Sequence, residues 1–186
     1  MRQKNVSTNV VFRLMVNLAQ HASVASKKSK MQEDARVINT TMNWMYKEKE
    51  YAPTFEEIQA DGLCGFVYII TNQLTGRKYI GQKKLISITR RKVKGKTRRV
   101  TTKSMSNWQD YWGSSRTLLE DVEKFGKEHF TREILDLCEA KGLMNYLELK
   151  YQMERNVLFT DDYYNGIVNI RLNETAIRNY GDRCKF

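Results

Sequence analysis

The sequence predicts a mixed α/β (α+β) fold, and three observations lead to that prediction. Residues 65–84 have the composition of a β-hairpin, and residues 130–137 alternate well enough for a third strand. Residues 116–125 and 141–156 carry apolar side chains at helical spacing. The chain has 186 residues, which is enough to bury a hydrophobic core in one domain, with or without an appendage.

The N-terminal third is predicted to be helical. An amphipathic helix is expected within residues 1–32, which contain no acidic residue, and we expect it to dock on the domain or on nucleic acid. A second helix is predicted over residues 33–50. The segment from Thr54 to Glu57 is a capping box that opens a third, short helix ending near Gly62. Residues 1–62 therefore read as a helical N-terminal extension with no assigned role.

The hairpin places two tyrosines on neighbouring strands. Residues 66–71 are β-branched and aromatic, residues 72–76 favour a turn, and residues 77–80 form the second strand. Tyr68 lies on the first strand and Tyr79 on the second, followed by a glycine and a run of positive charge. From the hairpin alone, core aromatic residues and a phosphate-handling pair are both open interpretations.

Positive charge is concentrated in one interval. The net charge is +11, yet no acidic residue occurs between Asp61 and Asp110, an interval that holds twelve lysines and arginines. Such a patch indicates a polyanionic partner, with binding that depends steeply on salt. We expect residues 83–103 to form a loop or ribbon that orders on a phosphate backbone; a solvated basic loop is the alternative.

Other residues limit the chemistry and the compartment. Three cysteines without C-x-x-C spacing suit a reducing compartment, so a cytoplasmic location is expected. Two histidines are too few for a typical zinc site, and no apolar run reaches the ~20 residues that cross a membrane. The aromatic residues Trp108, Tyr111 and Trp112 either pack on the core or stack on bases.

The C-terminal half supplies a further helix start, a carboxylate and an amide. The segment from Gly113 to Ser115 is an N-cap signal for the helix over 116–125, which Gly126 ends. Glu148 lies on the helix over 141–156. Asn165 falls in a polar loop, as a turn residue or a functional one.

Taken in order, these segments resemble the GIY-YIG nuclease superfamily, in its phage homing-type branch. The first half-motif stands as Phe66-Val67-Tyr68 and the second as Tyr79-Ile80-Gly81, with eleven residues from tyrosine to tyrosine. The helix after Gly113, the third strand, Glu148 and Asn165 follow in the family's order. The resemblance covers roughly residues 64–172. It implies a small three-stranded antiparallel sheet flanked by helices.

The resemblance also implies hydrolysis of a phosphodiester with one divalent metal. Glu148 would be the sole protein ligand of Mg²⁺ or Mn²⁺, with waters in the remaining positions. Tyr68 would activate or position the attacking water, and Tyr79 would hold that water or the phosphate. A tyrosine base needs nearby cations that favour its phenolate, which the cationic interval could supply. Gly81 would allow close backbone approach.

The chain departs from the family pattern after the second half-motif. Gln82 stands where many members have lysine, so Lys83 becomes the candidate for the phosphate contact. The family's catalytic arginine has no clear counterpart; Arg90, Arg91 and Arg98 compete, and Arg90 is preferred. His129 is assigned a structural role. The remaining predicted DNA contacts are Lys84, Arg91, Lys92, Lys94, Lys96, Arg98, Arg99, Lys103 and Asn165.

The leading hypothesis is a metal-dependent DNA endonuclease, of a phage-encoded homing type that works in the host cytoplasm. The expected partner is double-stranded DNA, with no membrane and no organic cofactor. The alternatives are a non-catalytic nucleic-acid-binding protein on the same fold and a repair or restriction nuclease. The predicted domain covers residues 63–172, with a cationic insertion over 83–112 and a polar tail over 173–186.

Overall fold

The computed structural model describes residues 42–92, 94–95 and 97–181. They lie in one compact unit, Thr40–Phe186. The helix predicted within residues 1–32, and residues 33–41 of the second predicted helix, fall outside the described residues. Within the described part of the chain, no helix is long and apolar enough to span a bilayer.

Five strands form the main sheet in the order β2-β1-β7-β3-β4. Strand β1 runs parallel to β7, and the other neighbours are antiparallel. The strands are β1 Trp44–Tyr46, β2 Lys49–Glu50, β3 Gly65–Asn72, β4 Lys78–Lys84 and β7 Phe130–Cys138. The predicted antiparallel trio is present as β7-β3-β4. The prediction of only three strands was wrong, because β1 and β2 extend the sheet.

The helix predicted over residues 33–50 is wrong for its described C-terminal part. Trp44 and Met45 lie in a strand, and the chain turns at Lys47 and Glu48, whose φ angles of 49° and 64° are left-handed. Trp44 is buried against Phe66, with ring centroids 5.0 Å apart. This packing decides the local structure, since strands of two or three residues are too short to show an alternating pattern. Residues 44–62 therefore add two strands and a helix to the unit rather than forming a helical extension.

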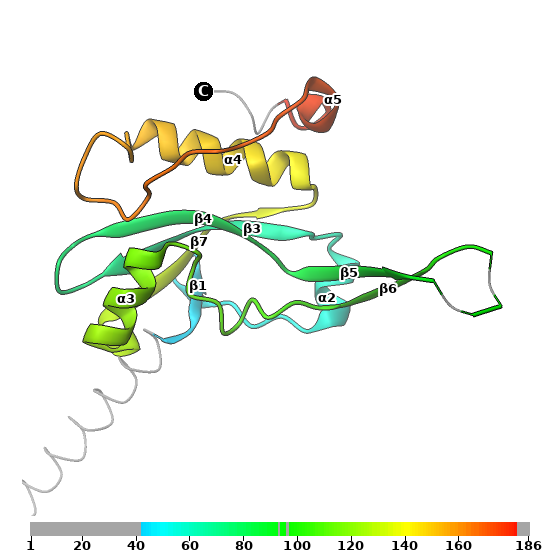
Figure 1. Cartoon of the computed structure of the whole chain (residues 1–186), viewed down its shortest axis with the longest axis horizontal. Helices are drawn as coiled ribbons and strands as arrows, with labels where there is room; N and C mark the ends of the chain where they lie inside the picture. The colour runs from blue at the N-terminus through cyan, green and yellow to red at the C-terminus, as the bar shows by residue number, and fades with distance from the viewer. Residues whose placement is uncertain (1–41, 93, 96, 182–186) are drawn as a thin grey trace, which may run out of the picture. The chain divides into compact units, whose positions relative to one another are not determined.

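Helices cover both faces of the sheet. Helix α4 (Lys141–Glu154) lies on one face and α3 (Arg116–Phe125) on the other (Figure 1). Helix α2 (Phe55–Ala60) begins with the predicted capping box: Thr54 Oγ1 accepts from the Glu57 N–H, and the Glu57 carboxylate accepts from the Thr54 N–H. The other helical elements are the 3-10 turns Lys127–His129 and Arg178–Tyr180 and helix α5, Glu174–Ile177.

The sheet divides the hydrophobic core into two layers. Tyr68, Phe66 and Ile70 point to the α3 face, where Trp108 and Trp112 are also buried. Val67, Ile69 and Ile80 point to the α4 face. The core-packing interpretation is therefore confirmed for the two tryptophans, while Tyr111 is only partly buried.

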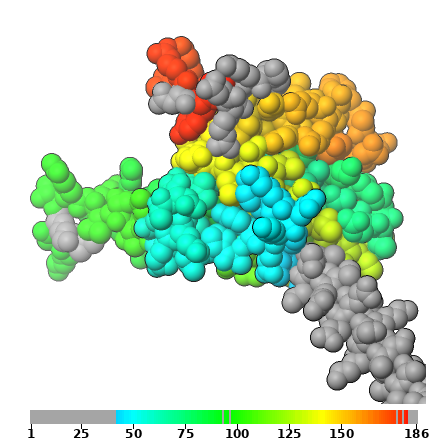
Figure 2. Space-filling view, turned by 180° about the vertical axis from the view of Figure 1, so that it is seen from behind, coloured from blue at the N-terminus to red at the C-terminus, as the bar shows by residue number. Residues whose placement is uncertain are grey.

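The cationic segment forms the predicted ribbon. Strands β5 (Ile86–Arg91) and β6 (Val100–Met105) pair antiparallel as a separate two-stranded sheet. The ribbon continues from β4 through the buried Leu85 and then runs out from the sheet, which Figure 2 shows as a green projection. Side chains on most of its length are exposed, because a two-stranded ribbon with this charge has no core to cover it.

Candidate active site

The two tyrosines of the hairpin converge at strand β4, which is the edge of the sheet. Tyr68 is fully buried on β3, opposite Gly81 of β4. A Cβ atom on Gly81 would lie 2.6 Å from the Tyr68 hydroxyl oxygen and 2.9 Å from Cε1 of Tyr79. Only glycine therefore leaves room for the Tyr68 hydroxyl beneath the edge strand. A register shift between Val67 and Tyr68 marks a β-bulge in the β3–β7 pairing at this point.

Tyr79 projects from β4 toward the start of helix α3. Its hydroxyl lies 3.0 Å from Oγ of Ser114, just before the helix. Its ring packs against that of Tyr68, with centroids 6.1 Å apart. Ser115 is the N-cap residue, as predicted, but its hydroxyl donates to the Tyr164 carbonyl at 3.0 Å and does not cap the helix. The first turn of α3 thus keeps its N–H groups free of a side-chain cap.

Glu148 reaches the same edge from the opposite face of the sheet. It lies on α4, and its Oε2 accepts a hydrogen bond from Nε2 of Gln82 at 2.6 Å. The same nitrogen donates to Oδ1 of Asn145 at 3.0 Å. Gln82 neighbours Gly81 on β4 but faces α4, because successive strand residues point to opposite faces. The edge strand therefore lets a carboxylate and two tyrosines meet across the sheet.

A cavity of about 360 Å³ is lined by both Tyr79 and Glu148. Tyr79 and Ser114 line it from one face, and Glu148 and Gln152 from the other. The remaining lining residues are Ser115, Tyr164, Asn165, Gly166, Ile167, Asn169 and Ile170. The segment after α4 thus closes the third side of the cavity.

Asn165 acts on the backbone of the edge strand. Its Oδ1 accepts from the Ile80 N–H at 3.0 Å, and its Nδ2 donates to the Ile80 carbonyl at 2.8 Å. The side chain thereby takes the place of a neighbouring strand beside Ile80. Asn165 is also mostly buried, at 8% exposed. This geometry fixes the position of Tyr79, the residue before Ile80.

Lys83 approaches the tyrosines through Tyr111. Its Nζ lies 3.7 Å from the centre of the Tyr111 ring and donates to Oδ1 of Asn107 at 2.8 Å. The Tyr111 ring in turn meets Tyr68 edge to face, with centroids 6.1 Å apart. Arg132 holds this segment, since it donates to the carbonyls of Gln109 and Tyr111 at 2.8 and 3.1 Å.

Burial governs the ionisation of the group. It raises the pKa of Tyr68 well above its ordinary value, and neighbouring tyrosines and Glu148 raise it further. Burial also raises the pKa of Tyr79, against the hydrogen bond with Ser114. Both tyrosines are therefore neutral hydroxyl groups near pH 7. The expectation that the cationic interval favours a phenolate at Tyr68 is wrong, because burial and nearby negative charge dominate.

Burial also shifts the pKa values of Glu148 and Lys83, in each case toward the uncharged form. It raises the pKa of the Glu148 carboxyl, while the hydrogen bond from Gln82 opposes that rise. It lowers the pKa of the Lys83 ammonium. Burial disfavours the charged form of both residues. Binding of an ion of opposite charge is therefore more favourable in free energy there than at an exposed surface.

The ribbon residues do not join this group. Arg90 pairs with Thr101 across the ribbon, five residues beyond Leu85, which is roughly 16 Å at the rise of a strand. Arg91, Lys92, Lys94, Arg98 and Arg99 are also exposed on the ribbon or its tip. Lys96 lies outside the described residues. Lys84 and Lys103 lie near the base of the ribbon instead.

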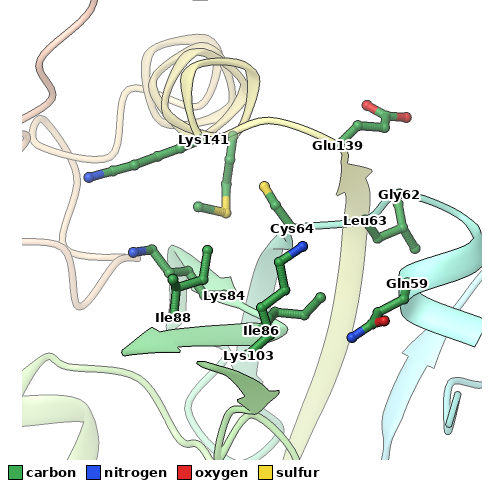
Figure 3. Close-up of a pocket in the computed structure, with 11 residues that line it drawn as sticks. Gln59, Gly62, Leu63, Cys64, Lys84, Ile86, Ile88, Lys103, Glu139 and Lys141 are labelled. Carbon is green, nitrogen blue, oxygen red and sulfur yellow. The ribbon is translucent and has the colours of Figure 1, made fainter. Parts of the chain in front are cut away.

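A second, larger cavity of about 510 Å³ lies at that base (Figure 3). Lys84, Lys103 and Lys141 line it together with Ile86 and Ile88 of the ribbon. It contains neither the tyrosines nor Glu148. The candidate site is therefore the smaller cavity, which Tyr79 and Glu148 line together.

Several residues of the site, among them four that contact the predicted ones or line the cavity, lay outside the sequence-based prediction. Ser114 and Tyr111 belong to segments that the sequence marks only as a helix start and an aromatic cluster. Asn145 and Gln152 stand three residues before and four residues after Glu148, which is the spacing of one helix face. That spacing was the available signal for them.

The oxygen donors around Glu148 suit a hard cation with several waters. Among the described residues no three His, Cys, Asp or Glu side chains gather as a metal-binding group. One half-buried carboxylate with side-chain amides beside it matches the preference of Mg²⁺, which is held by one or two carboxylates and keeps waters. The residues present therefore fit a single hydrated divalent cation.

Comparison with protein-family models identifies one match. The family is described as "Putative endonuclease segE, GIY-YIG domain", and its model matches residues 44–168. The match begins at β1 and ends just beyond Asn165, so it includes Tyr68, Tyr79 and Glu148, while Asn169 and Ile170 of the cavity lie beyond it. No curated protein and no solved structure matches the chain.

Proposed function

Because the chain belongs to the GIY-YIG endonuclease family, we propose that it is a metal-dependent DNA endonuclease that hydrolyses a phosphodiester at the edge of β4. The observation that carries this proposal is the meeting of Tyr79 and Glu148, from opposite faces of the sheet, in one cavity. A phosphodiester needs a nucleophile held on one side and charge stabilisation on the other. The two faces of the edge strand supply these two sides.

Glu148 is the proposed metal ligand. Its carboxylate lies beside the cavity, and its raised pKa shows that burial leaves its negative charge poorly solvated. A bound divalent cation would relieve that penalty. When bound, Mg²⁺ or Mn²⁺ would polarise the phosphate and stabilise the leaving oxygen.

The tyrosines are proposed to act as neutral hydroxyl groups. Tyr79, held by Ser114, would orient the attacking water or a phosphate oxygen through its hydroxyl. Tyr68 would support it from beneath Gly81. With pKa values raised by burial, these residues position the water rather than carry a standing negative charge.

The phosphate is proposed to lie near the start of α3. The helix has ten residues, and its first N–H groups have no side-chain cap. Free N–H groups and the positive end of the helix dipole favour an anion there. The ammonium of Lys83, which is partly desolvated above the Tyr111 ring, would make a second positively charged contact to the phosphate, beside the helix start.

The ribbon is proposed to bind the DNA duplex. A two-stranded β-ribbon fits the major groove of B-DNA, and the arginines and lysines on β5–β6 would contact phosphates. Arg90 then belongs to this contact set, while Asn165 is proposed as a positioning residue because its amide is bound to Ile80. We further propose a phage homing-type role in a reducing cytoplasm, which suits a chain whose three cysteines show no C-x-x-C spacing.

A plasmid-cleavage assay tests this function. Supercoiled DNA should be nicked or linearised with Mg²⁺ and left intact with a chelator, and Glu148→Gln should lose the activity. Glu154→Gln, on the exposed side of the same helix, is the matched control and should cleave normally. Tight, salt-sensitive binding with no cleavage under any metal would contradict the proposal and favour a non-catalytic DNA-binding protein.

A further inference from the structure

Two buried amide oxygens beside Glu148 have no hydrogen-bond partner among the described residues. They are Oε1 of Gln82 and Oε1 of Gln152. Gln82 donates to Glu148, and Gln152 lines the same cavity as Glu148. A buried polar atom without a partner destabilises a fold, so each such atom in a native protein calls for an explanation.

The orientation of the Gln82 amide is fixed by a chain of hydrogen bonds. The Arg171 carbonyl accepts from Nδ2 of Asn145 at 3.1 Å, so Oδ1 of Asn145 faces Gln82. That oxygen can only accept, which turns Nε2 of Gln82 toward it. Oε1 of Gln82 is therefore left unpartnered whatever the protonation state of Glu148.

The orientation of the Gln152 amide is fixed by the edge strand. Its Nε2 donates to the Ile80 carbonyl at 3.2 Å, and of the two ends of the amide only the nitrogen can donate to a carbonyl. Its Oε1 must then face away from Ile80. Gln152 is 4% exposed, so bulk water does not satisfy this oxygen. The fold itself does not need the amide, because Asn165 also donates to the Ile80 carbonyl, at 2.8 Å.

We propose that Gln82 and Gln152 are positioning residues that accept hydrogen bonds from the waters a divalent cation keeps when it binds at Glu148. This inference rests on the proposed metal site. Mg²⁺ gives up its waters reluctantly, and those waters are strong donors that need acceptors. Two amide oxygens without a partner, one on a side chain that donates to Glu148 and one on a side chain that lines its cavity, supply these acceptors. Mutation of residues that hydrogen-bond to a metal's ligands commonly changes metal affinity by about 10–100-fold.

The inference predicts that removing the Gln152 amide raises the stability of the metal-free protein and lowers its affinity for the metal. In Gln152→Met, a side chain of similar length removes the unpartnered oxygen, so the melting temperature of the metal-free protein should rise by about 2–6 °C. The affinity for Mn²⁺, measured by titration calorimetry, should fall by about tenfold or more. Gln59→Met, at an exposed position on α2, is the matched control and should change neither quantity.

Gln152→Glu gives a second measurement that does not depend on the methionine variant. It keeps an acceptor oxygen at residue 152 and adds negative charge, and Asn165 still donates to the Ile80 carbonyl, so Mn²⁺ should bind at least as tightly as to wild type. A purely structural role of Gln152 predicts instead that Met and Glu variants change metal affinity alike. Weaker Mn²⁺ binding by Gln152→Glu would overturn the inference.

Failure of the inference and failure of the proposed function give different results. Wild-type affinity in Gln152→Met, or a lower melting temperature of its metal-free form, would overturn the inference while Glu148→Gln still abolished binding. If wild type showed no saturable Mn²⁺ binding, or if Glu148→Gln bound as wild type does, the metal site itself would be wrong and the inference with it.

Discussion

At the scale of single residues, Gly81 decides whether the tyrosine pair can exist. The Tyr68 hydroxyl occupies the space that any side chain at position 81 would need. Alternation along β4 sends Tyr79 to the same face, so both rings share the space beneath one glycine. The second half-motif therefore contains a glycine for a packing reason, in addition to any approach of the DNA backbone.

Gly81→Ala should destabilise the protein by about 1–3 kcal/mol and displace both hydroxyl groups, because the added methyl overpacks a buried site. Cleavage should then fall by much more than the small unfolded fraction accounts for. Gly166→Ala is the control for stability, since a Cβ there meets nothing within 4 Å. Urea unfolding and a cleavage assay at a temperature where both variants are folded would check this. Wild-type stability in Gly81→Ala would contradict the packing argument.

The sequence predicted part of the site residue by residue. Tyr68, Tyr79 and Glu148 were found because their order along the chain follows a family pattern, and the structure brings them to one edge. Ser114, Asn145 and Gln152 were not found, because their roles depend on which strand lies beside them. The sequence suggested that the cationic interval could favour a phenolate if a tyrosine is the base, whereas burial raises the pKa of Tyr68, and burial cannot be read from nearby charges in sequence.

At the scale of elements, the ribbon β5–β6 places the proposed DNA contacts apart from the candidate site. It carries exposed arginines far from the cavity and adds no strand to the main sheet. Removing the positive charges of the ribbon should therefore weaken the proposed DNA binding without unfolding the main sheet.

Log affinity falls as log salt rises. Replacing Arg90, Arg91, Arg98 and Arg99 with glutamine should make this fall less steep, by roughly 0.9 in slope for each arginine that contacts a phosphate. The matched control replaces the same number of charges elsewhere, at Lys47, Lys49, Lys124 and Lys127, and should leave the slope nearly unchanged. Fluorescence anisotropy over a salt series measures both. An equal loss of slope in the two variants would mean that the ribbon is not the specific contact and that net charge alone attracts DNA.

Element prediction succeeded where patterns are long and failed where they are short. The hairpin, α3, β7 and α4 each span enough residues to show a period, and α2 carries a capping box. Strands β1 and β2 have three and two residues, and they form because Trp44 packs against Phe66 and because β7 offers an open edge. Such pairing is a tertiary effect that no local pattern records.

At the scale of the whole molecule, the site makes stability depend on pH. The unfolded chain releases the Glu148 proton near the ordinary value of 4.5, while the folded chain holds it to higher pH. Between these values the folded state binds more protons, so its stability falls as pH rises. Without metal, Glu148 therefore destabilises the fold at neutral pH relative to an uncharged residue.

Chemical denaturation of wild type and Glu148→Gln at about pH 4 and pH 8, without metal, tests this sign. The free energy of unfolding of wild type should fall relative to that of the variant as pH rises. Added Mg²⁺ at the higher pH should restore stability to wild type only, because the cation binds the folded carboxylate. A pH-independent difference would show that the Glu148 carboxyl is not perturbed by burial.

The central claim is that Tyr79 and Glu148 act from opposite faces of one strand on a single phosphate. The most direct measurement is the single-turnover cleavage rate of Tyr79→Phe, Glu148→Gln and the double variant on one DNA substrate with saturating Mg²⁺. Each single change should slow cleavage by about 10²-fold or more, and the double variant should be about as slow as the slower single one, because residues that act as a unit are not additive. Rate losses that multiply, or either single variant cleaving at the wild-type rate, would contradict the account.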